Sequence, residues 1–291
     1  MRDILVMLNM PNKTLTLSIV IPVYNEENYL AACLEAIAAQ SVAPDEVIVV
    51  DNNSTDRTAA IARSFDFVKL INEPNQHQSF AQKTGFNAAK SDIIGRIDAD
   101  SLQPEDWVKC VKTYFARNAK VVGITGSTQP YDVSVSSVGT KGFEFYINLA
   151  SRLAGQRMLW GANCAVRRDA WLKISGQVMT RGDIWEDYDL SFCLAPHGDL
   201  RFIDGIEIGS SFRAVRESLI HQTRYQFRAV RTFYFRLGFW RTARMMAVWS
   251  SLYLLFIPVM LDKHLLSPIV RLVRTGRVKT SSAEVVRLEA E

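Results

Sequence analysis

Two short runs of apolar, β-branched residues limit most strongly what this chain can fold into. Residues 17–23 (LSIVIPV) and 46–50 (EVIVV) are nearly continuous apolar segments, a pattern typical of parallel strands that are buried on both faces. Between them, residues 27–40 carry apolar side chains at helical spacing, and Asn25 followed by two glutamates predicts the start of this helix. The apolar positions of the predicted helix are Leu30, Cys33, Leu34 and Ile37.

The same alternation of strand and helix continues along the chain. Helices are predicted at 55–65, 79–89, 104–116, 143–153 and 184–194, strands at 67–71, 93–97, 121–125 and 161–166, a loop at 126–142, and one or two short strands at 202–208. Such alternation implies right-handed crossovers and an α/β fold with an open, mostly parallel, Rossmann-like sheet flanked by helices. Ligands of such sheets bind at the carboxyl ends of the strands.

Asp98-Ala99-Asp100 follows one of these predicted strands directly. Side chains two residues apart along a strand share a direction, so both carboxylates can converge on one hard cation that holds a diphosphate. The alternative is a pair of solvated carboxylates at a strand end. Polar residues at 22–25 and 51–54 end two other predicted strands, so we expect the three polar strand ends to meet at one edge of the sheet.

Four segments in this order closely resemble the family 2 glycosyltransferases of the GT-A fold. They are 18–27 (SIVIPVYNEE), 47–56 (VIVVDNNSTD), 98–100 (DAD) and 185–187 (WED), and the resemblance covers about residues 15–235. It implies an inverting transfer of a sugar from a nucleoside diphosphate sugar, with Mn²⁺ or Mg²⁺ as cofactor.

The resemblance also implies a donor site. Its nucleotide-binding residues would be Pro22, Val23, Tyr24, Asn25, Glu26, Asp51, Lys83, Asp98, Ala99 and Asp100. The carboxylate of Asp51 accepts but cannot donate, which suits the ring N–H of uracil or guanine and favours UDP or GDP over ADP. Asp51 as the first residue of a turn, and Lys83 as a solvated lysine, remain alternatives.

Metal and acceptor residues follow from the same resemblance. Asp100 and Asp98 would bind the metal, and Asp187 would be the general base that activates the acceptor hydroxyl. Trp185, Glu186 and Arg224 would line the acceptor site, with Trp185 as a core residue the alternative. Residues 221–225 (HQTRY) resemble the Q-x-x-R-W segment of processive members, with two departures. His221 is either a metal ligand or a structural residue such as a helix cap.

Charge is distributed unevenly along the chain. Residues 1–212 hold 20 Lys and Arg against 25 Asp and Glu, whereas residues 213–291 hold 14 against 5. The basic part interleaves arginines with aromatic residues and contains an uncharged run at 245–261, which favours an anionic membrane surface over nucleic acid as the partner. A helical hairpin packed on protein is the alternative. We therefore predict a catalytic domain at 1–216 and a membrane-associating region at 217–291.

The sequence thus predicts a glycosyltransferase at the cytoplasmic face of the cell membrane. The donor would be a UDP-sugar or a GDP-sugar, and the acceptor a hydroxyl of a glycan, most simply a lipid-linked saccharide. Polyprenyl phosphate as the acceptor, and a non-catalytic nucleotide-sugar-binding membrane scaffold, are the alternatives, and a homo-oligomer is left open. The sequence indicates neither the sugar nor the identity of the acceptor.

Overall fold

A computed structural model gives the fold of the chain and describes residues 14–131, 148–149, 151–211, 213 and 219–246, the side chains of 130 and 219–226 excepted. The chain divides into two compact units, Met1–Gly238 and Phe239–Glu291. The first unit contains every strand described below. The boundary that we predict near residue 216 remains a prediction.

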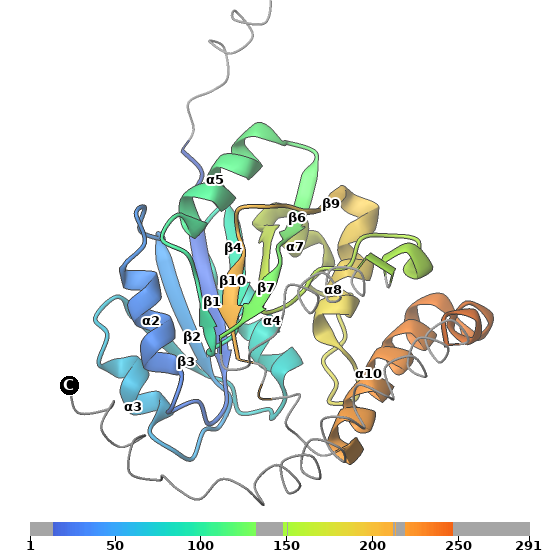
Figure 1. The fold of residues 1–291 in the computed structure, drawn as a ribbon, viewed down its shortest axis with the longest axis horizontal. Coiled ribbons are helices and arrows are strands. Elements are labelled where there is room, and N and C mark those ends of the chain that lie inside the picture. Colours follow the sequence, from blue (N-terminus) through green and yellow to red (C-terminus); the bar gives the residue numbers. More distant parts are fainter. Residues whose placement is uncertain (1–13, 132–147, 150, 212, 214–218, 247–291) are drawn as a thin grey trace, which may run out of the picture. The chain divides into compact units, whose positions relative to one another are not determined.

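A central sheet of seven strands organises the first unit (Figure 1). All of its neighbours pair in parallel except β8, which runs antiparallel to both β4 and β6. The mostly parallel α/β sheet predicted from the sequence is therefore confirmed. In spatial order the strands are β3 (Val68–Asn72), β2 (Glu46–Asp51), β1 (Leu17–Val23), β4 (Ile93–Ile97), β8 (Asn163–Arg167), β6 (Val121–Thr125) and β9 (Asp199–Phe202).

Helices pack on both faces of this sheet because its strands are apolar on both sides. One core cluster joins the sheet to α2 (Leu30–Ala38), α3 (Thr58–Arg63) and α5 (Trp107–Arg117). The other joins the opposite face to three further helices, α4 (Gln78–Ala88), α7 (Arg168–Ile174) and α8 (Glu186–Leu194). A single-turn helix, η1 (Ala195–His197), follows α8. The sheet is thus enclosed, and its strand ends remain for binding.

A second, smaller sheet lies next to the Asp-x-Asp segment. It has the order β5 (Ser101–Leu102), β10 (Ile208–Ser210) and β7 (Thr128–Pro130), with β10 antiparallel to β5 and parallel to β7. Because β5 follows Asp100 directly and β10 nearly reaches Arg213, this sheet brings residues more than one hundred positions apart into one site.

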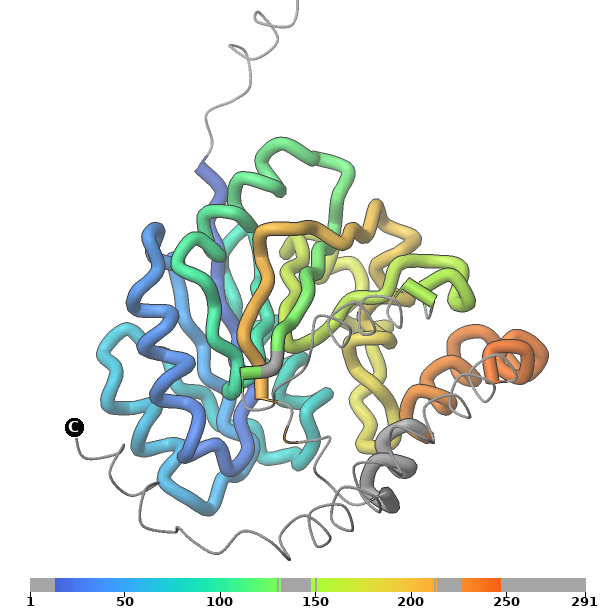
Figure 2. The backbone as a smooth tube through the Cα atoms, viewed as in Figure 1, coloured from blue at the N-terminus to red at the C-terminus, as the bar shows by residue number. Residues whose placement is uncertain are grey.

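Helix α10 (Leu219–Leu237) packs against α8 through the ring of Phe233, which contacts Tyr188 and Phe192, and makes three polar contacts with α8 and the residues just before it. The Trp185 N–H donates to Thr232 Oγ1 at 2.8 Å, and Arg236 lies 2.6 Å from Asp189. In the third, Arg231 lies 2.7 Å from Asp183, just before α8. Figure 2 shows the backbone of α10 running past that of α8. Helix α10 therefore belongs to the same unit as the sheet.

Most predicted elements form within a few residues of the predicted bounds, and the strands at 93–97 and 121–125 match them. The helix predicted at 27–40 begins only at Leu30, and Asn25 does not cap it. Instead Asn25 takes a backbone φ of 54°, and its side chain accepts hydrogen bonds from Thr55. Asn tolerates this left-handed conformation better than most residues, so it forms a link between loops and not a helix cap.

The basic C-terminal region falls largely outside the described residues. Most of the uncharged run predicted at 245–261 lies there, so its structure stays a prediction. Among the helices that the structure does describe, none combines the length and the apolar character needed to cross a membrane.

Candidate active site

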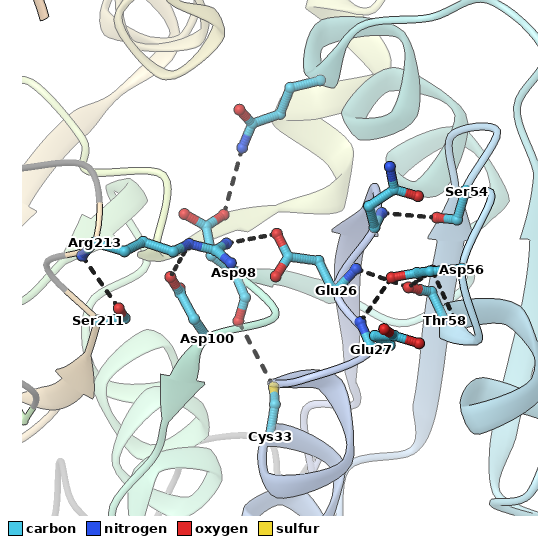
Figure 3. A network of polar contacts seen from close by, with 12 residues as sticks. Glu26, Glu27, Cys33, Ser54, Asp56, Thr58, Asp98, Asp100, Ser211 and Arg213 are labelled. Carbon is cyan, nitrogen blue, oxygen red and sulfur yellow. Dashed lines mark hydrogen bonds and ion pairs between the residues drawn. The ribbon is translucent and has the colours of Figure 1, made fainter. Parts of the chain in front are cut away.

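The ends of β1 and β2 are tied together by side chain to backbone hydrogen bonds. The Asn25 N–H donates to Ser54 Oγ at 3.0 Å, and the Glu26 N–H donates to Thr58 Oγ1 at 2.7 Å. Figure 3 shows this connection, with Asp98 and Asp100 beyond Glu26. The expectation that the polar strand ends meet at one edge of the sheet is confirmed.

The residues predicted to bind the nucleotide differ in exposure. Pro22 and Val23 end β1 and are buried, whereas Tyr24 is about half exposed. Asp51 ends β2, is buried, and accepts a hydrogen bond from the Ser54 N–H at 3.1 Å. Asp51 therefore does hold a turn, as the alternative interpretation has it, and its contact with a base stays a prediction. Lys83 is half-buried on α4.

Three carboxyl groups gather where β4 ends. Asp98 and Asp100 lie on either side of the buried Ala99, and Glu26 approaches from the end of β1 (Figure 3). Burial, together with the negative charges of Asp98 and Glu26, raises the pKa of Asp100 to about 7. Burial also raises the pKa of Glu26. The arrangement concentrates negative charge in a place that water screens poorly.

Arg213 lies among these carboxylates. Its Nη2 donates to Glu26 Oε1, and its Nε lies 3.3 Å from Asp100 Oδ2. The guanidinium also stacks over the ring of Tyr29, 4.5 Å from the ring centroid. Arg213 could not be predicted from the sequence, because no motif surrounds it and only the small sheet brings it to Asp100.

The donor set fits a hard divalent cation that arrives with a nucleotide. Although Glu26, Asp98 and Asp100 lie near one another, among the described residues no three His, Cys, Asp or Glu side chains are placed so that they could hold a metal ion by themselves. Mg²⁺ bound with phosphates usually takes one or two protein carboxylates and completes its coordination with phosphate oxygens and water, and Mn²⁺ prefers the same oxygen ligands. Asp98 and Asp100 supply two carboxylates side by side, and a cation there would favour the ionised form of Asp100.

Asp187 lies in the first turn of α8. Its Oδ2 accepts the Gly161 N–H at 3.1 Å, and its Oδ1 accepts its neighbour's N–H, that of Tyr188, at 2.8 Å. Burial and the adjacent charge of Glu186 raise the pKa of Asp187, although Arg96 acts in the opposite direction. A carboxylate held by two backbone donors and with a raised pKa suits a general base.

Arg96 connects the carboxylates at the end of β4 with those at the start of α8. It is the one charged residue of β4 and only 1% exposed. Its Nη2 lies 3.0 Å from Asp98 Oδ1 and 3.2 Å from Glu186 Oε1. None of the sequence motifs assigns a role to Arg96. The available signal was a charged residue inside an otherwise apolar strand predicted to be buried on both faces.

The remaining predicted residues are placed only in part. Trp185 is 4% exposed and packs edge-on against Tyr188, with ring centroids 4.7 Å apart, as the core alternative describes. Glu186 turns towards Arg96. The acceptor roles of both stay predictions. His221 and Arg224 lie on α10, but their side chains are outside the described residues, so their predicted roles are not tested.

Comparison with known proteins identifies relatives in several microorganisms. The chain is 25% identical over 198 residues to the uncharacterized glycosyltransferase alr2836 of Nostoc sp., a match that covers 64% of this chain and 61% of the relative. It is 34% identical over 114 residues to the glycosyltransferase AglE of Haloferax volcanii, covering 36% and 38% of the two chains. The matches thus span less than two thirds of these relatives' lengths.

Solved structures show the same fold. The mannosyltransferase PcManGT from Pyrobaculum calidifontis, in complex with GDP-Man and Mn²⁺, superposes with a TM-score of 0.55 at 18% identity, covering 84% of this chain and 82% of the other. S. aureus TarS 1-349 in complex with UDP-GlcNAc gives a TM-score of 0.56 at 15% identity, covering 72% and 61%.

A family-wide comparison is more decisive than any single relative. The sequence model described as Glycosyl transferase family 2 matches residues 18–174, more than half of the 291 residues. The matched segment contains β1, β2 and β4 with the polar residues at their ends. The chain therefore belongs to glycosyl transferase family 2 and is a glycosyltransferase.

Proposed function

We propose that this protein transfers a sugar, with inversion and with the help of Mn²⁺ or Mg²⁺, from a UDP-sugar or a GDP-sugar to a hydroxyl group of a membrane-presented, lipid-linked saccharide. The observation that carries this proposal is that two pairs of carboxylate side chains lie around Arg96. Asp98 and Asp100 form one group at the end of β4, and Glu186 and Asp187 form the other at the start of α8.

The donor carboxylates would hold the diphosphate through the metal. A divalent cation at Asp98 and Asp100 would supply Lewis-acid stabilisation of the departing nucleoside diphosphate. Asp51 would accept the ring N–H of uracil or guanine. The solved structures of similar fold are complexes with UDP-GlcNAc in one case and with GDP-Man and Mn²⁺ in another, which supports both nucleotides as candidates.

Asp187 would accept the proton of the attacking hydroxyl. A raised pKa makes the ionised form of Asp187 a stronger proton acceptor than an ordinary aspartate. One displacement, with the base on one side of the sugar and the leaving group on the other, inverts the anomeric carbon.

A lipid-linked acceptor is supported by two independent observations. One relative, 23% identical over 171 residues, is the glucosyl-dolichyl phosphate glucuronosyltransferase of Haloferax volcanii, and its name describes transfer to a sugar on a lipid phosphate. Helix α10 and the residues after it also expose aromatic side chains among arginines, including Phe227, Tyr234, Phe239 and Trp240. Such a mixture suits the interface of an anionic membrane. We propose the cytoplasmic face of the cell membrane as the location of the protein.

Binding of nucleotides tests the donor half of the proposal. Wild-type protein and the Asp100→Asn variant would be titrated with UDP and GDP, each with and without Mn²⁺, by calorimetry. We expect the wild type to bind either UDP or GDP in a Mn²⁺-dependent manner. The Asp100→Asn variant should bind that nucleotide about tenfold or more weakly, since one of the two carboxylate ligands is gone. Asp106→Asn, at an exposed aspartate beside α5, is the matched control.

Two outcomes of this titration would contradict the proposal. Folded wild-type protein that binds neither nucleotide would remove the donor assignment. Equal nucleotide affinity of Asp100→Asn and wild type in Mn²⁺ would remove the metal assignment, while leaving a metal-independent donor site.

A further inference from the structure

Arg96 is buried where a charge is costly. Its strand is otherwise apolar, and only 1% of the residue is exposed. Burial alone would lower the pKa of Arg96, but the charges of Asp98, Glu186 and Asp187 outweigh it and raise that pKa. Since burying an unpaired charge costs several kcal/mol, a guanidinium is retained in such a place only with compensating partners. The partners of Arg96 come from the donor side and from the base side of the proposed site.

A single nitrogen makes both contacts. Nη2 of Arg96 is 3.0 Å from Asp98 Oδ1 and 3.2 Å from Glu186 Oε1. Asp98 belongs to the segment after β4, and Glu186 is the first residue of α8. Without the guanidinium of Arg96 between them, the carboxylates of Asp98 and Glu186 would repel each other, because they are close together and water screens their charges poorly. Arg96 therefore bridges the end of β4 and the start of α8.

Gly161 provides the space for this guanidinium. A β-carbon at position 161 would lie 1.6 Å from Nη1 of Arg96, and the three atoms nearest to it all belong to that guanidinium. The N–H of the same Gly161 donates to Asp187 Oδ2. The guanidinium is thus packed against the peptide group that holds the proposed base.

We infer that Arg96 is a positioning residue for glycosyl transfer, which sets the place of the base Asp187 relative to the metal-binding segment through Glu186 and Gly161. The inference rests on the proposed function and adds to it a residue with no expected contact to either substrate. Loss of Arg96 would let the start of α8 move away from β4. Nucleotide would still bind to Asp51 and Asp100, but Asp187 would be misplaced for proton transfer.

The test compares Arg96→Met and Arg96→Lys with wild type in the full-length chain. The probes are UDP-GlcNAc and GDP-mannose with Mn²⁺, and the readout is release of UDP or GDP with water as the acceptor, analysed as kcat and KM. For Arg96→Met we expect kcat to fall about 10- to 100-fold, the scale of a misplacement near 1 Å, with the donor KM nearly unchanged. Arg96→Lys should recover part of kcat because it restores the charge but not the full reach.

A matched control separates this role from general stability. Arg167 of β8 is a partly buried arginine whose guanidinium donates to the backbone carbonyls of Val121, Phe115 and Asn118 and not to α8. We expect Arg167→Met to lower the melting temperature and to leave kcat of the folded protein near the wild-type value. Normal kcat in folded Arg96→Met, or an equal loss of kcat in Arg167→Met, would overturn the inference.

Gly161→Ala tests the geometry without removing any charge. Its methyl group would displace the guanidinium, so we expect the variant to lose kcat and stability as Arg96→Met does. The double variant Arg96→Met/Gly161→Ala should be little worse than the more affected single variant, because residues in contact are not additive. Additive losses would overturn the inference. A wild type that binds neither nucleotide would instead overturn the proposed function. In that case, comparing the melting temperatures of wild type, the two single variants and the double variant would still decide whether Arg96 and Gly161 are in contact.

Discussion

Nε of Arg213 lies 3.3 Å from Oδ2 of Asp100, whose carboxylate we propose as a metal ligand. The arginine reaches this place from beyond β10, more than one hundred residues further along the chain. It is half-buried, and burial would lower the pKa of Arg213, but the carboxylates of Glu26 and Asp100 raise it. A positive charge therefore already sits at the edge of the carboxylate cluster.

Removal of Arg213 should strengthen the binding of a divalent cation. We expect Arg213→Ala to bind Mn²⁺ about three- to tenfold more tightly than wild type, since a like charge close to the site is removed but is partly screened by solvent. Calorimetric titration with Mn²⁺ alone measures this. Arg201→Ala, at an exposed arginine paired with Asp199, is the control. Weaker Mn²⁺ binding by Arg213→Ala would mean that Arg213 supports the site and does not compete with the cation.

Transfer should depend on pH through Asp187. The folded-state pKa of this carboxyl is raised above its ordinary value of 3.8, so the active, ionised form is lost at a higher pH than for an unperturbed aspartate. The acidic limb of kcat/KM should therefore lie well above pH 4. By the same shift, the contribution of this group to stability is full below its unfolded pKa and is lost as pH rises through its folded pKa.

Replacement of the base separates binding from turnover. Asp187→Asn should bind Mn²⁺ and nucleotide nearly as wild type does, while kcat falls by about 10²- to 10⁴-fold, the usual worth of a general base. The measurement is the pH profile of kcat/KM in wild type and of residual turnover in the variant. Near-normal transfer by Asp187→Asn would favour a phosphate acceptor, which needs no strong base.

The buried pair of Asp189 and Arg236 should matter for stability. Asp189 is 1% exposed, and it also accepts the Met179 N–H at 2.7 Å. Arg236→Met should lower the free energy of unfolding by about 3 kcal/mol, because it leaves a buried carboxylate without its cation. Denaturant unfolding measures the loss. The double variant Arg236→Met/Asp189→Asn should recover part of it, and a larger loss in the double variant would contradict this account.

Exposed aromatic residues of α10 should contribute to membrane binding. Phe227 and Tyr234 are 61% and 52% exposed, and Arg231 lies between them in sequence at helical spacing. Phe227→Ser/Tyr234→Ser should weaken binding to vesicles that contain anionic lipid, as measured by cosedimentation at low and high salt. Leu172→Ser, at an exposed leucine of α7, is the control. If wild type and double variant bind such vesicles equally, these side chains serve another interface.

The fold was largely predictable because its strands are apolar on both faces. The composition of runs such as 17–23 and 93–97 alone predicts buried parallel strands, and the apolar residues of the intervening helices recur at helical spacing. The start of α2 was not predictable, since Asn25 makes its hydrogen bonds to Thr55, thirty residues away, and not to its own helix. Nothing local distinguishes a helix cap from such a link.

The residues of the candidate site could be proposed from the sequence only where a motif marks them. Asp98, Asp100 and Asp187 follow from short segments that keep their spacing, whereas Arg213 reaches Asp100 only because β10 pairs with β5. Arg96 was visible as an anomaly, a charge inside a buried strand. Its partners were not, since pairing with Glu186 depends on how α8 returns to the sheet.

The contacts between α8 and α10 have a consequence for the direction from which an acceptor can approach the proposed base. Asp183, Trp185 and Asp189 are held by Arg231, Thr232 and Arg236, respectively. The aromatic surface of α10 and the proposed base at the start of α8 therefore belong to the same compact unit and are joined by these contacts. If that surface rests on a lipid bilayer, it fixes the angle at which the base faces the bilayer. An acceptor anchored in the same bilayer would then meet Asp187 from one direction only, so regiochemistry would depend on how the enzyme is seated as well as on the shape of its pocket.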